Sequence, residues 1–245
     1  MAGIKRQLDS LLRWRASTRY PPSAFLLAAQ LISLILYAAV DTNASGRALV
    51  GSFGVLILAL VVWVINRRAM LPSIAWLLVV PSFVLSLLSS LGFNPTLLMW
   101  SSILEAILYF YAAGSLIVYM MEDYRVTIDE LFAAGATFTL IAWGFAYVYL
   151  ACQIWFPGSF TGLNFPGEPR TFVELLSLSF ANLSATGLGD ILPLTSAARV
   201  LVMLEQFAGV AYIAVVVSRL IGMTIMLQQD NRKILRNSRT RENKG

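Results

Sequence analysis

Two glycines separated by one residue lie in the last third of the chain, within the stretch Leu183-Ser184-Ala185-Thr186-Gly187-Leu188-Gly189-Asp190. Glycine adopts backbone angles that other residues avoid, so the peptide carbonyls around Gly187 and Gly189 can all face one side. In a membrane, a row of such carbonyls can replace the water around a cation. The loop therefore predicts a cation site made of backbone oxygens, and Asp190 adds an acidic group at its end.

The composition predicts a protein that spans a membrane several times. Of the 245 residues, 58% are hydrophobic and only 13% are charged, which is too apolar for an ordinary soluble domain. The chain has no histidine, which disfavours His-dependent metal sites and Ser-His or Cys-His nucleophile pairs. The one cysteine, Cys152, lies in an apolar run and is predicted to be a packing residue.

Six apolar runs approach or exceed the length of about 17 to 25 helical residues that crosses a bilayer. They lie at 23–40, 48–65, 71–91, 97–121, 131–156 and 197–227. A further apolar stretch, 172–183, would be about 18 Å long as a helix, so it can enter a membrane without crossing it. The sequence therefore predicts an all-α membrane protein with six transmembrane helices and one re-entrant segment between the fifth and the sixth.

The distribution of Lys and Arg predicts the orientation of these helices. The N-terminus, the loops after the second and fourth runs, and the tail hold 14 of the 18 basic residues. Because Lys and Arg accumulate on the cytoplasmic side, both termini are predicted to be cytoplasmic. The basic residues lie beside membrane spans without interleaved aromatics, so we expect the tail to contact anionic lipid headgroups and expect no nucleic-acid partner.

A helix-start signal precedes the glycine loop. Thr171-Phe172-Val173-Glu174 matches a capping box, in which the Thr hydroxyl and the Glu carboxylate each accept a hydrogen bond from the other residue's backbone amide. The helix that follows would direct its partially negative C-terminal end into the membrane, where a cation is favoured. A tight turn between two hairpin helices is the alternative for this loop, but the order of capped short helix, glycine loop and long final span favours a pore.

The residues around the loop resemble a known family. Phe180 to Pro193 reads F-A-N-L-S-A-T-G-L-G-D-I-L-P, followed by Arg199, Leu201, Leu204, Glu205, Gly209, Tyr212 and Ala214. This order is similar to the pore region of the potassium-channel superfamily, in particular bacterial six-transmembrane channels of the two-helix-pore type. The similarity covers about 100 residues, because it extends upstream through Arg125-Val126-Thr127 and Pro157-Gly158-Ser159-Phe160. It implies a pore helix at 172–184, a selectivity filter at 185–190 and an inner helix at 197–227.

The resemblance also implies the site residues, with potassium as the permeant ion and no cofactor. The ion-binding carbonyls belong to Ala185, Thr186, Gly187 and Leu188, with Gly189 at the outer mouth and Asp190 at the filter exit. Ala185 stands where the family has a threonine whose hydroxyl helps to form the innermost ion site. Leu188 replaces a tyrosine that braces the filter. Potassium is the expected ion, and a non-selective cation pore is the alternative.

Three further residues are candidates for support of the pore. Gly209 takes the hinge position of the inner helix, where a residue without a side chain allows bending or, alternatively, close helix packing. Glu205 lies four residues before Gly209 on the same helix face, and we expect it to support the pore helix or the filter, as we do Glu174. Glu105 is the only charged residue in 97–121, so it is either a protonated packing residue or a protonation-sensitive element.

The predicted organisation has five parts. A basic cytoplasmic N-terminus, 1–22, precedes a four-helix domain, 23–121, which resembles a voltage sensor but lacks gating charges, since 97–121 holds no Lys or Arg. A cytoplasmic linker, 122–130, leads to the pore domain, 131–227, and a basic cytoplasmic tail, 228–245. Because one loop cannot surround an ion, the channel hypothesis implies a homotetramer in the bacterial cytoplasmic membrane, with weak or no voltage dependence.

Two other classes of protein fit the sequence less well. Gly-Leu-Gly-Asp also resembles the GxGD motif of intramembrane aspartyl proteases, but such enzymes need two aspartates that share a proton. The other aspartates near the membrane, Asp41, Asp123 and Asp129, all lie at span ends. Secondary transporters often have paired broken segments in two halves, and the first half here has no counterpart of 171–190. We therefore expect no enzymatic activity.

Overall fold

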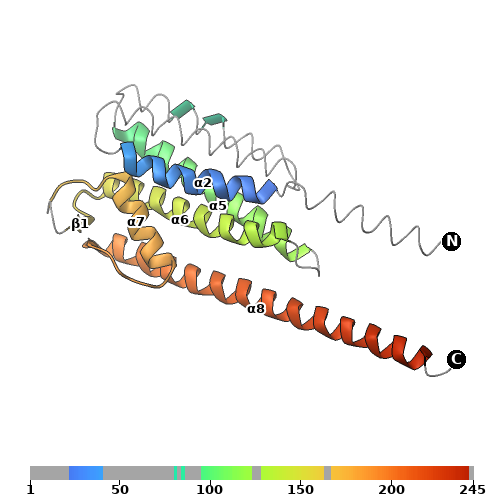
Figure 1. Ribbon diagram of the computed structural model, residues 1–245. Coiled ribbons are helices and arrows are strands. Elements are labelled where there is room, and N and C mark those ends of the chain that lie inside the picture. Colours follow the sequence, from blue (N-terminus) through green and yellow to red (C-terminus); the bar gives the residue numbers. More distant parts are fainter. Residues whose placement is uncertain are drawn as a thin grey trace.

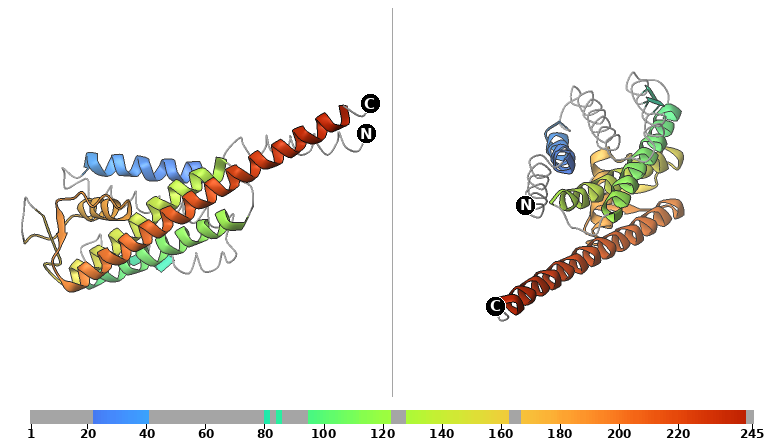
Figure 2. Two further views of the ribbon diagram at one scale, coloured as in Figure 1. Left: turned by 90° about the horizontal axis from the view of Figure 1, so that it is seen from below. Right: turned by 90° about the vertical axis from the view of Figure 1, so that its right-hand side faces the viewer.

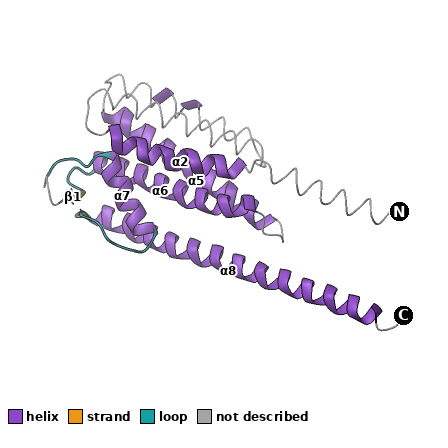
Figure 3. Ribbon diagram, in the orientation of Figure 1, coloured by secondary structure: helices purple, strands orange, loops and turns teal. Residues whose placement is uncertain are grey.

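The computed structural model describes residues 22–40, 80–81, 84–85, 95–122, 128–162 and 167–242, and it is mostly helical (Figures 1 and 3). Its main elements are α2 (Pro22–Val40), α5 (Pro95–Glu122), α6 (Ile128–Trp155), β1 (Phe160–Gly162), α7 (Phe172–Leu183), β2 (Ile191–Pro193) and α8 (Ser196–Glu242). Residues 1–21 of the predicted N-terminal segment 1–22 lie outside the described residues, as do the span 48–65, most of the span 71–91 and linker residues 123–127.

Among the described residues, three helices are long and apolar enough to cross a membrane. They are Thr96–Met121 in α5, Asp129–Trp155 in α6 and Ser196–Arg219 in α8. The apolar part of α2, Ser23–Tyr37, is shorter, as is α7. The coarse prediction of a helical membrane protein is therefore confirmed, and the helix bounds of α5 and α6 agree with the predicted spans to within three residues.

Helix α6 lies at the centre of the described fold. It packs against α5 and α2, and also against α7 and α8 (Figure 1). Bulky aromatic side chains fill the space between α2, α5, α6 and the start of α7: Tyr37, Tyr109, Trp143, Tyr147 and Phe172. The ring centroid of Phe172 lies 4.6 Å from that of Tyr147 and 5.9 Å from that of Trp143. The first residue of α7 is thus packed against α6.

Polar side chains join these helices at two levels. The Asp129 carboxylate, in the first turn of α6, accepts hydrogen bonds from the Ser23 amide at 3.1 Å and from the Tyr119 hydroxyl at 3.0 Å. Deeper in the bundle, Glu105 of α5 is buried next to the side chain of Tyr147 of α6. The burial of a carboxyl group within apolar helices requires such a partner. These polar contacts therefore join α2, α5 and α6 to one another.

Helix α8 is longer than the sequence predicted. The apolar run ends at 227, but the helix continues to Glu242 and extends beyond the rest of the described fold (Figure 2). The segment 228–242 contains no Pro or Gly and has four Arg and two Gln, which favour helix. A fall in hydropathy shows where an apolar segment ends, whereas a helix ends only where the residues no longer favour helical backbone angles. The predicted basic tail is thus mostly helical.

Candidate pore region

The start of α7 has the predicted capping box. Thr171 has extended backbone angles, and its side-chain oxygen accepts a hydrogen bond from the Glu174 amide at 3.3 Å. The Glu174 carboxylate in turn accepts from the Thr171 amide at 2.6 Å. Glu174 therefore satisfies the first turn of α7, and its negative charge lies at the positive end of the helix dipole. The helix spans 172–183, one residue less than predicted at its C-terminal end.

Arg170, which the sequence patterns did not single out, anchors the segment before α7. It is only 5% exposed, and its guanidinium donates to the Glu168 carbonyl and lies 3.4 Å from the Glu174 carboxylate. Its backbone exchanges two hydrogen bonds with the Gln153 side chain, at 2.8 and 2.9 Å. A Cβ atom at Gly162 would lie 2.6 Å from the guanidinium, so glycine leaves room for it. These contacts fix the entry to α7 against the end of α6.

The loop after α7 has an unusual backbone. Among the described residues, Ala185 is the only non-glycine with a positive φ, at 58°, and Gly187 has a φ of 63°. Thr186 and Leu188, which alternate with them, are not left-handed. Residues that alternate between left-handed and right-handed angles turn successive carbonyls toward the same side, and the left-handed region costs a non-glycine residue roughly 1–2 kcal/mol. In this loop, two left-handed residues, Ala185 and Gly187, are thus separated by one residue that is not left-handed.

Hydrogen bonds hold this loop against the C-terminal end of α7. The Ala181 carbonyl accepts from the Thr186 amide, the Thr186 hydroxyl and the Gly187 amide, at 3.1, 3.1 and 3.0 Å. The Ser184 and Thr186 hydroxyls lie 3.1 Å apart. The predicted filter residues 185–190 are all exposed in the single chain. The loop is therefore anchored at its start and open along the predicted ion-binding stretch.

Glu205 joins three helices. It is fully buried on α8, and its carboxylate is hydrogen-bonded by the Tyr149 hydroxyl of α6 and the Ser179 hydroxyl of α7. The Ser179 oxygen also lies 2.8 Å from the Ala142 carbonyl of α6. A buried carboxylate is stable only when such donors satisfy it. The contact places Glu205 against the middle of the short helix that leads into the loop.

Gly209 lies where α8 crosses the end of α7. A Cβ atom at this position would be 2.1 Å from the Leu183 carbonyl oxygen and 2.8 Å from its carbonyl carbon. One residue earlier in the chain than Leu183, Asn182 accepts a hydrogen bond from the Gln206 side chain at 3.1 Å. Both contacts bring α8 against the last turn of α7, so the structure contains the close packing that was the alternative role for Gly209.

Two short strands, one before α7 and one after the loop, pair with each other. Strand β1 pairs antiparallel with β2, with Phe160 opposite Pro193 and Gly162 opposite Ile191. Beside them, the Leu194 amide donates to the Ser159 carbonyl at 2.8 Å, and the Ser159 and Thr195 hydroxyls lie 3.1 Å apart. Asp190 lies immediately before β2 and is exposed. The segment that follows the loop is thus hydrogen-bonded to the segment that follows α6.

The structure brings some of the predicted residues together around α7. Glu174 is at its start, Glu205 at its middle and Gly209 at its end, while 185–190 form the loop that follows. Sequence reasoning missed Tyr149, Ser179 and Arg170. Ser179 is a hydroxyl residue in a short apolar helix and Tyr149 lies within an apolar span, and polar side chains in such segments tend to pair with each other.

Comparison with known proteins identifies one family. Residues 106–226 match a protein family described as Ion channel. The matched stretch contains all of α6, α7 and the loop, together with most of α5 and the apolar part of α8. No curated protein and no solved structure matches the chain. The family match supports an ion channel and not an enzyme.

Proposed function

We propose that four copies of this chain form a cation channel that passes potassium along the backbone carbonyls of residues 185–188. The observation that carries the proposal is the capped helix α7, which ends against α8 and leads into a loop whose φ alternates in sign. The C-terminal end of a helix favours a cation, and aligned carbonyls can replace its water. The family match supports the ion-channel part of this proposal.

The exposure of apolar side chains near the loop supports the tetramer. In the single chain, Leu188 is 83% exposed and Phe207 of α8 is 76% exposed. One loop supplies only one side of an ion's coordination shell, so several copies must surround a common axis. Four chains with six transmembrane helices each, both termini cytoplasmic and the loop facing outward, satisfy this requirement. A particle mass of one chain in lipid nanodiscs would contradict the tetramer.

A non-selective cation channel is the second candidate, and Ala185 and Leu188 favour it. Alanine supplies no hydroxyl at the first loop position, and leucine supplies no hydrogen bond behind the loop. We expect Ala185→Thr and Leu188→Tyr, made singly and together, to increase the permeability of potassium relative to sodium. Reversal potentials of the reconstituted variants measure this change. Unchanged selectivity in all three variants would show that these side chains do not set the ion preference.

The absence of basic residues from the first four apolar runs predicts weak voltage dependence. The runs 23–40, 48–65, 71–91 and 97–121 contain no Lys or Arg, and Glu105 of α5 is buried. Each elementary charge that crosses the field contributes about 2.3 kcal/mol per 100 mV, which corresponds to an e-fold change in the open-to-closed ratio for about 26 mV. We therefore expect a conductance–voltage relation less steep than this value. A curve that requires several charges per chain would contradict the prediction.

A further inference from the structure

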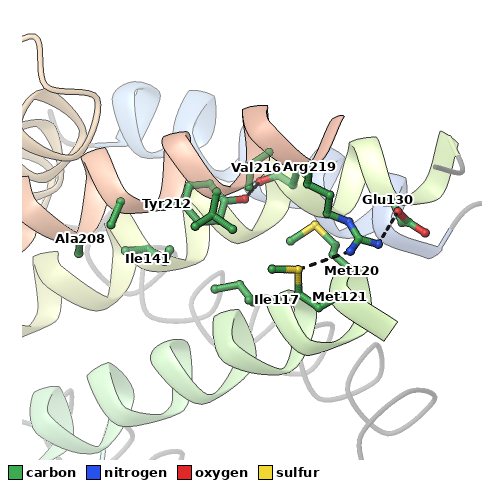
Figure 4. Close-up of a pocket in the computed structure, with 12 residues that line it drawn as sticks. Ile117, Met120, Met121, Glu130, Ile141, Ala208, Tyr212, Val216 and Arg219 are labelled. Atoms are coloured by element: carbon green, nitrogen blue, oxygen red, sulfur yellow. Dashed lines mark hydrogen bonds and ion pairs between the residues drawn. The ribbon is translucent and has the colours of Figure 1, made fainter. Parts of the chain in front are cut away.

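An apolar pocket of about 310 Å³ lies between α5, α6 and α8, toward the ends of these helices that are far from the glycine loop (Figure 4). Its walls come mostly from apolar side chains, including Ile117 and Met120 of α5, Ile141 of α6 and Val216 of α8. The volume is at the lower end of the range of about 300–1,000 Å³ that is typical of ligand sites. A cavity with such walls does not hold water well, so it suits an apolar occupant.

One end of the pocket is charged. Arg219 of α8 lies there with its guanidinium 3.5 Å from the Glu130 carboxylate and 3.4 Å from the Met121 sulfur (Figure 4). Charge-assisted hydrogen bonds between such groups are typically about 2.7–2.9 Å long, and a thioether sulfur is a weak acceptor. A phosphate oxygen at the place of the Met121 sulfur would accept a stronger hydrogen bond from Arg219.

We propose that this pocket binds one acyl chain of an anionic phospholipid, with the phosphate of its headgroup at Arg219. Within the described part of the chain, the three helices that line the pocket are long and apolar enough to cross a membrane, so we expect acyl chains around it. Met120 and Met121 have flexible side chains that can adapt to a chain of variable shape. The site is separate from the basic segment 228–245, because Arg219 lies at the end of the apolar part of α8.

A lipid chain in the pocket would contact α6 and α8 of the proposed pore and also α5, which precedes them. Tyr212, which lines the pocket on α8, donates a hydrogen bond from its hydroxyl to the Ala134 carbonyl of α6 at 2.6 Å. The same pocket is bounded by the end of α5. A lipid chain in this position touches the helix before the loop, the helix after it and α5 at once, so its presence affects how these helices move relative to one another.

Photolabelling of the full-length protein tests the proposal. The protein is reconstituted in phosphatidylcholine vesicles that contain either phosphatidylglycerol or phosphatidylcholine with the same diazirine-bearing acyl chain. We expect the phosphatidylglycerol probe to label residues 117–121, 134–141 and 208–219 roughly tenfold more than the phosphatidylcholine probe, because the choline cation competes with Arg219 for the phosphate of phosphatidylcholine, whereas phosphatidylglycerol carries no such cation. Equal labelling by the two probes would overturn the proposal.

Two exposed alanines on α8 provide a matched pair of variants. Ala211 lines the pocket, whereas Ala214, three residues later, does not. Ala211→Leu is expected to reduce labelling of 117–121 and 134–141 severalfold, and Ala214→Leu is expected to leave it unchanged. An equal effect of the two substitutions would mean that the label comes from lipid on the outer surface of the helices.

Substitutions of the charged pair should act in opposite directions. Arg219→Gln removes the cation and should abolish the preference for phosphatidylglycerol, while Glu130→Gln removes the competing carboxylate and should increase it.

Label from a diazirine fatty acid without label from the phospholipid would instead assign a free acid, and cross-links from the pocket to a second copy of the chain would assign a protein contact. Labelling requires no ion conduction, so the result is independent of whether the chain is a potassium channel.

Discussion

Gly209→Ala is expected to abolish potassium conduction by the reconstituted protein. The new Cβ atom would lie 2.1 Å from the Leu183 carbonyl oxygen, which is a backbone atom and cannot rotate away. Either α8 or the last turn of α7 must move, and the loop that begins at Ser184 moves with it. Overpacking of this kind typically costs about 1–3 kcal/mol. Single-channel recording and the thermal unfolding midpoint measure the two effects.

Gly222 provides the control for this substitution. It lies on the same helix, and a Cβ atom added there would have no neighbouring atom within 4 Å, so Gly222→Ala meets no obstacle. Alanine stabilises helix relative to glycine by roughly 1 kcal/mol, so this variant should be at least as stable as the original protein and should conduct normally. If Gly209→Ala keeps its unit conductance and only opens less often, Gly209 acts as a hinge and not through packing.

Glu205→Ala is expected to destabilise the protein more than any other single truncation near the loop. It leaves the Tyr149 hydroxyl buried without its acceptor, whereas the Ser179 hydroxyl can still donate to the Ala142 carbonyl. Each unsatisfied buried group costs about 1–3 kcal/mol. Glu205→Gln should cost less, because its amide can accept from one hydroxyl and donate to the other. Unfolding of the purified variants in detergent, followed by circular dichroism, gives the order.

A triple variant separates the hydrogen-bond network from simple packing. Glu205→Leu combined with Tyr149→Phe and Ser179→Ala removes all three polar groups together, and replacement of both partners by apolar groups can be nearly neutral. We expect the triple variant to be more stable than Glu205→Ala. If the hydrogen-bond network positions α7, the triple variant should nevertheless conduct poorly. Wild-type stability of Glu205→Ala would contradict the role of Glu205 as a buried acceptor.

Features that depend on neighbouring residues in the chain could be predicted from the sequence. The capping box of Thr171 and Glu174 is such a feature, because its partners are three residues apart. The acidic first turn of α6 and the bounds of α7 follow from the same local preferences. The glycine loop was recognised from Gly187 and Gly189, although the structure gives a left-handed backbone to Ala185 as well, where no glycine marks it.

Features that depend on long-range packing could not be predicted. Glu205 meets a hydroxyl 56 residues away, at Tyr149, and another 26 residues away, at Ser179. No periodicity relates these positions. The contact of Gly209 with Leu183 depends on the angle at which α8 crosses α7. The burial of Arg170 depends on its contacts with Gln153, Gly162 and Glu168. From the sequence, these residues could be named as candidates at most, because their partners depend on how the helices pack.

The reversal potential of the unmodified protein, reconstituted in a planar bilayer with potassium on one side and sodium on the other, tests the central claim most directly. The proposed function predicts a current carried by cations that reverses strongly toward the potassium equilibrium potential. A current that reverses near zero would mean that the pore does not distinguish the two ions. A reversal set by the anion gradient, or no current from protein that is folded and tetrameric, would contradict a cation path through residues 185–188.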